Sequence, residues 1–174
     1  MTRMVNRAIV AFPRTNALDA IEGLRRRFDP LAEMIAAHIT LVFPFTSDST
    51  AGELRSHIEH TIAGLGPFQV RLVGITAVDD EYVFLNVGDG RDRVIQLHDR
   101  LYTGALASHL SREHVYSPHV TLGRLRDGRA AAHALAEAIA VAPGGNATIQ
   151  DISVFRLNGP DRGVIEFTVP LETT

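Results

Sequence analysis

A nearly identical tetrapeptide occurs twice in this chain, once in each half. His38 opens the sequence His-Ile-Thr-Leu, and His119 opens the sequence His-Val-Thr-Leu. With the residue frequencies of this chain, only about 0.06 His-x-Thr-Leu tetrapeptides are expected by chance. Both copies place apolar residues at alternate positions, which is typical of a strand with one buried face. The fold therefore has to accommodate two matching strands.

The elements around the two tetrapeptides repeat in the same order. Each half reads as a strand that starts at the histidine, then a helix, then a hairpin of two strands. We expect strands at 8–12, 38–45, 68–78, 82–87, 119–125, 148–157 and 164–171, and helices around 18–24, 54–65, 94–110 and 129–140. The capping-box pattern Thr50-x-x-Glu53 opens the second helix, and Asp79-Asp80-Glu81 predicts the turn of an antiparallel hairpin. This order predicts two duplicated lobes that face each other, packed as an α+β fold without a crossover-linked parallel sheet.

Side-chain alternation along a strand places His38 beside Thr40 and His119 beside Thr121, each pair on one face. If the lobes are related by an approximate two-fold axis, two imidazoles and two hydroxyls converge on one cleft. One neutral imidazole can then accept a proton while the opposite protonated imidazole donates one. The hydroxyls can bind the oxygens of a phosphate group, so this pattern predicts phosphate chemistry with no obligatory metal.

Composition excludes several other classes of protein. The chain has no cysteine, which rules out a thiolate nucleophile and a Cys-ligated zinc. All 17 basic residues are arginine, so nucleic-acid ligation through a lysyl-nucleotide intermediate is also excluded. The net charge of -3 gives no cationic field for long nucleic acids, and a small or end-bound anion is favoured. With no long apolar run and no signal-peptide pattern, we expect a cytoplasmic protein without membrane contact.

At these residues the sequence resembles the 2H phosphoesterase superfamily, the 2′-5′ RNA ligase-like and cyclic phosphodiesterase proteins. The segment from Tyr116 to Arg124 is similar to the second family motif, with an aromatic residue, Pro-His and a trailing arginine. The segment 38–41 matches the first motif. The resemblance implies a bilobal fold with pseudo-two-fold symmetry, in which helices flank two antiparallel sheets and an active-site cleft lies between them. Residues 1–174 would form one such domain of two intertwined lobes.

The same resemblance implies that His38 and His119 are catalytic and that Thr40 and Thr121 bind phosphate. The implied reactions open 2′,3′-cyclic phosphates or make and break 2′,5′ linkages, without a cofactor. The substrate would be a small cyclic nucleotide or an RNA end, and no obligatory protein partner is evident. A second hypothesis remains open from the sequence, namely a nucleotide- or RNA-end-binding module with little turnover.

Two further residues of the second motif are possible substrate contacts. Tyr116 could stack on a nucleobase, or it could be a packed aromatic residue at the entry to the strand. Arg124 could reach phosphate, but strict alternation from His119 places it on the opposite face unless the strand twists or bulges.

Overall fold

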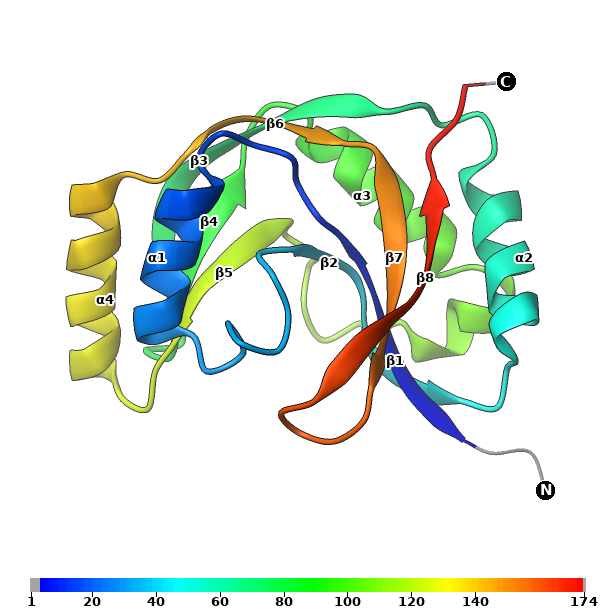
Figure 1. Ribbon diagram of the computed structural model, residues 1–174, viewed down its shortest axis with the longest axis horizontal. Coiled ribbons are helices and arrows are strands. Elements are labelled where there is room, and N and C mark those ends of the chain that lie inside the picture. Colours follow the sequence, from blue (N-terminus) through cyan, green and yellow to red (C-terminus); the bar gives the residue numbers. More distant parts are fainter. Residues whose placement is uncertain (1–3, 174) are drawn as a thin grey trace.

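One antiparallel sheet of eight strands runs through the whole molecule, as a computed structural model of residues 4–173 shows (Figure 1). The strands are β1 Val5–Ala11, β2 Ile39–Ser47, β3 Phe68–Val78, β4 Tyr82–Val87, β5 His119–Arg124, β6 Gly145–Ile149, β7 Asp151–Leu157 and β8 Gly163–Pro170. The helices are α1 Leu18–Phe28, α2 Ala51–Ile62, α3 Arg91–Leu101 and α4 Gly128–Val141, with a 3₁₀ helix at Gly104–His109.

The strand order β6-β3-β4-β5-β2-β1-β7-β8 corrects the expectation of two separate sheets. The α+β class is confirmed, but β2 and β5 pair at the centre, where Ile39 lies opposite Val120. This is the only register pair between them among the described residues. The two four-stranded halves are therefore joined into one curled sheet by a short contact between the strands that carry the repeated tetrapeptides.

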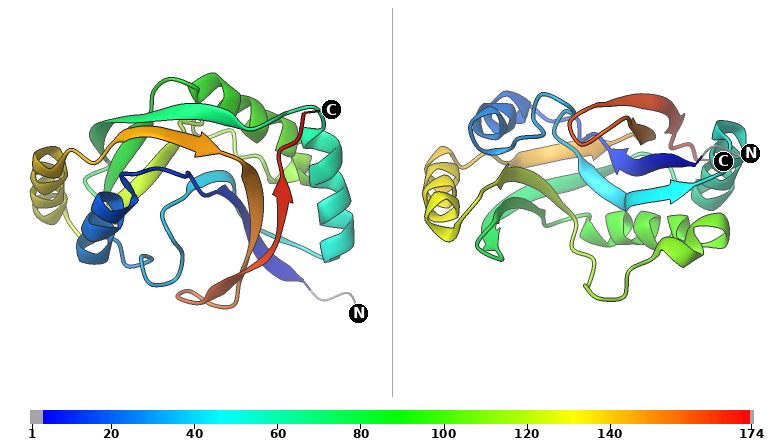
Figure 2. Two further views of the ribbon diagram at one scale, coloured as in Figure 1. Left: turned by 45° about the horizontal axis from the view of Figure 1, so that its top comes forward. Right: turned by 90° about the horizontal axis from the view of Figure 1, so that it is seen from below.

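The run 148–157, expected to be one strand, is divided at Gln150 into β6 and β7. β6 pairs with β3 in one half of the sheet, and β7 pairs with β1 in the other. Figure 2 shows this segment passing from one half to the other. Arg14, just beyond β1, exchanges two backbone hydrogen bonds with Thr148 of β6, of 3.0 and 2.9 Å. We call this region, where β6 pairs with the segment that follows β1, the closed end.

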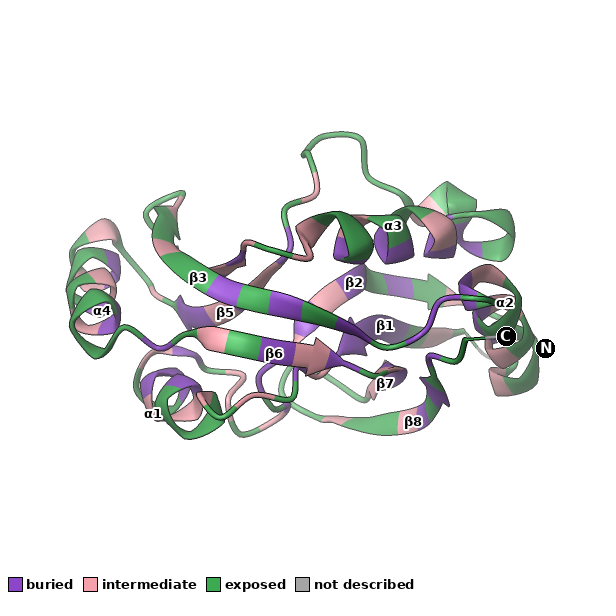
Figure 3. Cartoon of the chain, turned by 90° about the horizontal axis from the view of Figure 1, so that it is seen from above, coloured by how far each residue is buried: buried purple, intermediate pink, exposed green. Residues whose placement is uncertain are grey.

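Two helices pack across the junction between the halves. α1 follows β1 but packs against β5 and α4, whereas α3 follows β4 but packs against β2 and α2 (Figures 1 and 2). The helices cover one face of the sheet, and the apolar residues of the two tetrapeptides, Ile39, Leu41, Val120 and Leu122, are buried beneath them. The alternation of buried and exposed positions is visible along β3 in Figure 3. The histidines and threonines consequently project from the opposite face.

Local sequence signals account for several element boundaries. The predicted capping box is present, with Thr50 Oγ1 accepting from the Glu53 amide while the Glu53 carboxylate accepts from the Thr50 amide. The β3–β4 hairpin turns through Asp79 and Asp80, both at positive φ, which aspartate tolerates better than most residues. The helix expected over 94–110 instead ends at Leu101, and the 3₁₀ helix follows it. In the described part of the chain, no helix is long and apolar enough to cross a membrane.

Alanine substitutions at two glycines, Gly23 of α1 and Gly123 of β5, should have opposite effects on stability. A Cβ atom at Gly123 would lie 3.0 Å from Phe28 Cβ and 3.3 Å from the Phe28 carbonyl oxygen, whereas a Cβ at Gly23 would meet nothing within 4 Å. We expect Gly123→Ala to lower the free energy of unfolding by about 1 kcal/mol or more through overpacking. Gly23→Ala should raise it by about 0.5–1 kcal/mol, because alanine is the better helix former. Urea denaturation of both variants checks this, and equal effects would contradict it.

Candidate active site

The two histidines and two threonines of the repeated tetrapeptides lie together on the helix-free face of the sheet. Extending the β2–β5 register by one residue in each direction places His38 opposite Thr121, and Thr40 opposite His119. Residues that lie opposite each other in an antiparallel pair share a face, so the four side chains form one cluster. The histidines occupy diagonal corners, a geometry that separates their Cα atoms by about 7–8 Å. We call these four side chains the His-Thr cluster.

Both imidazoles are oriented by the same local hydrogen bond. His38 Nδ1 lies 2.8 Å from the Ala36 carbonyl oxygen, and His119 Nδ1 lies 2.7 Å from the Ser117 carbonyl oxygen. A carbonyl oxygen only accepts, so Nδ1 carries the proton in each ring. In the neutral form each Nε2 is therefore a free acceptor, and in the protonated form it is a donor. The two rings can consequently take either proton-transfer role.

Burial is the main cause that lowers the pKa of both histidines. It acts on His38 against the raising effect of the Ala36 hydrogen bond, and the positive charges of Arg25 and His119 lower the pKa of His38 further. Burial likewise lowers the pKa of His119, opposed by the hydrogen bond to Ser117. Of these influences on the pKa of His38, the charge of His119 is the smallest. At neutral pH the unliganded cluster therefore favours neutral rings.

Aromatic rings support the two imidazoles in different ways. Phe84 of β4 stacks on His119, with 3.6 Å between ring centroids and 18° between the planes. Phe12, just beyond β1, meets His38 edge to face at 6.4 Å. Across residues 4–173, no group of three or more His, Cys, Asp or Glu side chains is placed to hold a metal ion. The polar groups of the cluster are thus imidazole nitrogens and threonine hydroxyls.

A buried ionic network fixes the segment that leads into β2. Arg25 of α1 is only 1% exposed, and it donates to Asp29 at 2.8 and 3.0 Å and to the Ile35 carbonyl at 2.9 Å. Glu22, which also pairs with Arg25, accepts from the Ala37 amide at 2.5 Å. The residue before the first histidine is therefore held by a carboxylate. Nothing in the sequence distinguishes Arg25 from the two arginines that follow it, so this network was not predictable.

The structure places Tyr116 beside the backbone of β2 at Thr40. Its hydroxyl donates to the Thr40 carbonyl at 2.7 Å, and its ring stacks on His98 of α3 with 3.7 Å between centroids. His98 Nδ1 in turn lies 2.8 Å from the Leu41 carbonyl oxygen. Tyr116 thus occupies the packed position that was one of its two expected roles, and one face of its ring is covered by His98. Both side chains hold the backbone of the strand that carries Thr40.

A β-bulge brings Arg124 to the same face as the His-Thr cluster. Val83 pairs with Gly123 but Phe84 pairs with Thr121, so β5 contains one extra residue, Leu122. Alternation is reset there, and Arg124 lies opposite Tyr82, which shares its face with Phe84. The guanidinium of Arg124 lies 5.6 Å from the Tyr82 ring centroid and 2.8 Å from the Glu81 carboxylate. Strict alternation had placed this residue on the other face.

With this geometry established, comparison with known proteins identifies the family. The family model described as the 2′-5′ RNA ligase superfamily matches residues 12–161. A Bacillus cereus (strain G9842) protein, named as a candidate phosphoesterase, is 31% identical over 119 residues, which cover 67% of each chain. A similar candidate phosphoesterase of Bacillus licheniformis is 28% identical over 120 residues, which cover 67% of this chain and 69% of that protein. The chain therefore belongs to the 2′-5′ RNA ligase superfamily, as its paired motifs predicted.

Solved structures agree on the fold. E. coli LigT, in a complex with 3′-AMP, matches with a TM-score of 0.66 and 18% sequence identity over 98% of this chain and 100% of LigT. The protein TT0787 of Thermus thermophilus matches with a TM-score of 0.65 and 14% identity over 97% of this chain and 98% of that protein. The curled sheet with crossed helices is thus an arrangement that these proteins share.

The lowered histidine pKa values predict that the protein loses stability on acidification. His38, His98 and His119 bind protons more weakly in the folded chain than in the unfolded chain, where their pKa is near 6.5. As the pH falls below about 6.5, the unfolded state takes up more protons, so the free energy of unfolding decreases. Urea denaturation between pH 7.5 and 5 measures this. A His98→Gln variant should show a shallower decrease, and constant or rising stability on acidification would contradict the prediction.

Proposed function

We propose that this protein is a metal-independent phosphodiesterase that acts on RNA ends or small nucleotides. It would open 2′,3′-cyclic phosphates, or cleave and form 2′,5′ linkages, by general acid/base catalysis with two histidines. The observation that carries the proposal is the matched orientation of His38 and His119, each with Nδ1 bonded to a backbone carbonyl and Nε2 available for proton transfer. Such a pair suits a reaction that needs a base and an acid at once.

In the proposed hydrolysis, the neutral imidazole of one histidine accepts a proton from water through Nε2. The water oxygen forms a bond to phosphorus while the bond from phosphorus to the ribose O3′ breaks. The protonated imidazole of the other histidine donates its proton to O3′, which leaves as a hydroxyl. The product is a 2′-phosphate. The histidine that acted as the base ends protonated, and the histidine that acted as the acid ends neutral. Attack by a ribose hydroxyl in place of water would form a linkage by the same proton transfers.

The remaining polar groups of the face would bind the phosphate oxygens. Thr40 and Thr121 lie opposite His119 and His38, so each hydroxyl is beside an imidazole. Hydroxyl donors at these positions would stabilise the charge that builds up on non-bridging oxygens in the transition state. Arg124 shares this face because of the bulge and carries a permanent positive charge. We assign it a contact with the substrate rather than a proton-transfer role.

A bound substrate would leave one of the two histidines protonated and the other neutral. In the unliganded protein burial lowers the pKa of both rings, which favours the neutral base. A phosphate anion between them attracts a proton and raises these pKa values, because the opposite charge stabilises the imidazolium. One proton shared by the pair would then provide an acid beside a base. The titration would belong to the pair and not to either ring.

The comparisons support a nucleotide substrate. E. coli LigT, with which this chain shares its fold, has been crystallised with 3′-AMP, with ATP and with NADP+. The curated relatives are named as candidate phosphoesterases. Together with the superfamily, these names favour a phosphate ester of a nucleoside over other phosphate compounds.

Substitution of the histidines tests the catalytic assignment. We expect His38→Ala and His119→Ala each to lower kcat/KM for a 2′,3′-cyclic nucleotide by about 10² to 10⁴-fold, because each removes one proton-transfer group. The double variant should lose much less than the product of the two single losses, since the groups act as a unit. His60→Ala, an exposed histidine on α2, is the matched control and should keep full activity. Full activity in both single variants would refute the assignment.

An assay in EDTA separates the enzyme from a binding module. We expect turnover of 2′,3′-cyclic nucleotides to continue in EDTA, because the imidazoles perform the proton transfers and the hydroxyls bind the phosphate. Chromatography of the products and calorimetric binding of a 2′-phosphate would be measured on the same protein. Binding without any product would favour the module, and loss of turnover in EDTA would favour a metallohydrolase.

A further inference from the structure

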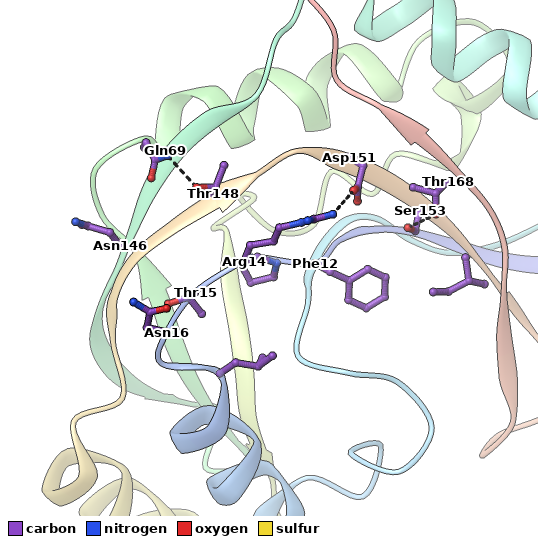
Figure 4. Close-up of a pocket in the computed structure, with 13 residues that line it drawn as sticks. Phe12, Arg14, Thr15, Asn16, Gln69, Asn146, Thr148, Asp151, Ser153 and Thr168 are labelled. Carbon is purple, nitrogen blue, oxygen red and sulfur yellow. Dashed lines mark hydrogen bonds and ion pairs between the residues drawn. The ribbon is translucent and has the colours of Figure 1, made fainter.

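A groove of about 820 Å³, lined by both apolar and polar side chains, lies at the closed end of the sheet (Figure 4). Its polar lining includes Arg14, Asn16, Gln69, Asn146, Asp151 and Thr168. This volume is in the range of grooves that hold small organic ligands in proteins. Neither the tetrapeptides nor the family motifs include these residues, and the reaction proposed above assigns them no function.

The groove and the cluster occupy the same face of the sheet. Thr40 pairs with Val10 of β1, Val10 pairs with Ser153 of β7, and Ser153 pairs with Thr168 of β8. These register partners form one row, in which Ser153 and Thr168 line the groove. Two strand spacings of about 4.8 Å separate Thr40 from Ser153 by about 10 Å. Val10 in this row is buried in a small apolar cluster against which Phe12 packs, so a molecule that occupies both places has to pass over this cluster.

Phe12 lies between the two places and contacts both. It lines the groove, and its ring meets His38 edge to face. The ring is half-buried, so part of its surface is open to a ligand. An aromatic ring in this position offers a stacking surface for a nucleobase.

The walls of the groove are held in place by hydrogen bonds within the protein. Arg14 and Thr148 exchange two backbone hydrogen bonds, and Gln69 Nε2 donates to Thr148 Oγ1 at 2.8 Å. Ser153 and Thr168 share a hydrogen bond of 2.8 Å between their hydroxyls. Figure 4 shows these side chains around the opening. These bonds order Gln69, Ser153 and Thr168, so a ligand would meet little entropic cost from ordering those side chains.

The charges of the groove favour a neutral polar ligand. Arg14 and Asp151 form an ion pair at 3.5 Å, so the lining carries one charge of each sign beside amides and hydroxyls. A free phosphate would meet the Asp151 carboxylate as well as the Arg14 guanidinium. The base and sugar of a nucleoside are uncharged and rich in donors and acceptors, and they match this lining better.

We propose that this groove binds the nucleoside on the 5′ side of the terminal nucleoside, which itself carries the reacting phosphate. The preferred substrate is then an RNA end of at least two nucleosides rather than a cyclic mononucleotide. The terminal phosphate lies at the His-Thr cluster, and the preceding base stacks on Phe12 with its polar edge along Arg14 and Gln69. This inference rests on the proposed function, because it assumes that the cluster binds the terminal phosphate.

Binding of two product analogues tests the groove independently of turnover. The probes are adenosine 2′-monophosphate and the RNA dinucleotide ApA with a 2′-phosphate at its 3′ end, compared by calorimetry. We expect the dinucleotide to bind the wild-type protein about tenfold more tightly, as one stacked and hydrogen-bonded nucleoside allows. Arg14→Ala and Gln69→Ala should each remove most of this advantage. Arg129→Ala, an exposed arginine on α4, should retain it.

Two results would overturn the groove proposal. One is equal affinity of the wild-type protein for both probes, and the other is an unchanged advantage in both groove variants. Absence of turnover with tight dinucleotide binding would instead reject the proposed function and keep the groove. Circular dichroism of the Arg14→Ala variant checks folding, since the hydrogen bonds that Arg14 makes to Thr148 are backbone bonds and survive the substitution.

Discussion

The short pairing of β2 with β5 is the contact on which the rest of the molecule depends. Ile39 and Val120 form the register pair there, and this contact joins two four-stranded halves and places all four residues of the His-Thr cluster on one face. It is the one register pair between these strands in the described part of the chain, and side chains also hydrogen-bond to the backbone of β2 nearby. Tyr116 and His98 hold two of its carbonyls, and the Tyr102 hydroxyl accepts from the Phe43 amide. The backbone of β2 is thus hydrogen-bonded at these positions by side chains from α3 and from the segment before β5.

Much of this fold could be predicted from the sequence, because the periodic and turn signals are local. The capping box at Thr50 and the hairpin turn at Asp79 depend on neighbours in the chain, and both were predicted correctly. The continuity of the sheet could not be predicted, since it depends on a pairing between strands far apart in sequence. The division at Gln150 was missed for the same reason, because each part of that run pairs with a different half.

The candidate site shows the same limit. Repetition singles out the two histidines, and alternation predicts that each shares a face with its threonine. The carbonyl bonds to Ala36 and Ser117 involve backbone atoms, which have no signature in side-chain identity. The bulge at Leu122, which turns Arg124 to the face of the His-Thr cluster, arises from the register against β4 and not from β5 itself. The groove at the closed end combines residues from segments far apart in the chain, so only the folded chain reveals it.

The crossed helices have a consequence for how such a molecule can assemble. α1 leaves one half of the sheet to cover β5 in the other, and α3 makes the reciprocal crossing to β2. Neither half therefore possesses its complete apolar lining until the opposite half is present. The two halves are interdependent, because each is covered in part by a helix whose preceding strand belongs to the other half. Contacts of such large sequence separation close wide loops, and the entropic cost of closing them generally slows folding.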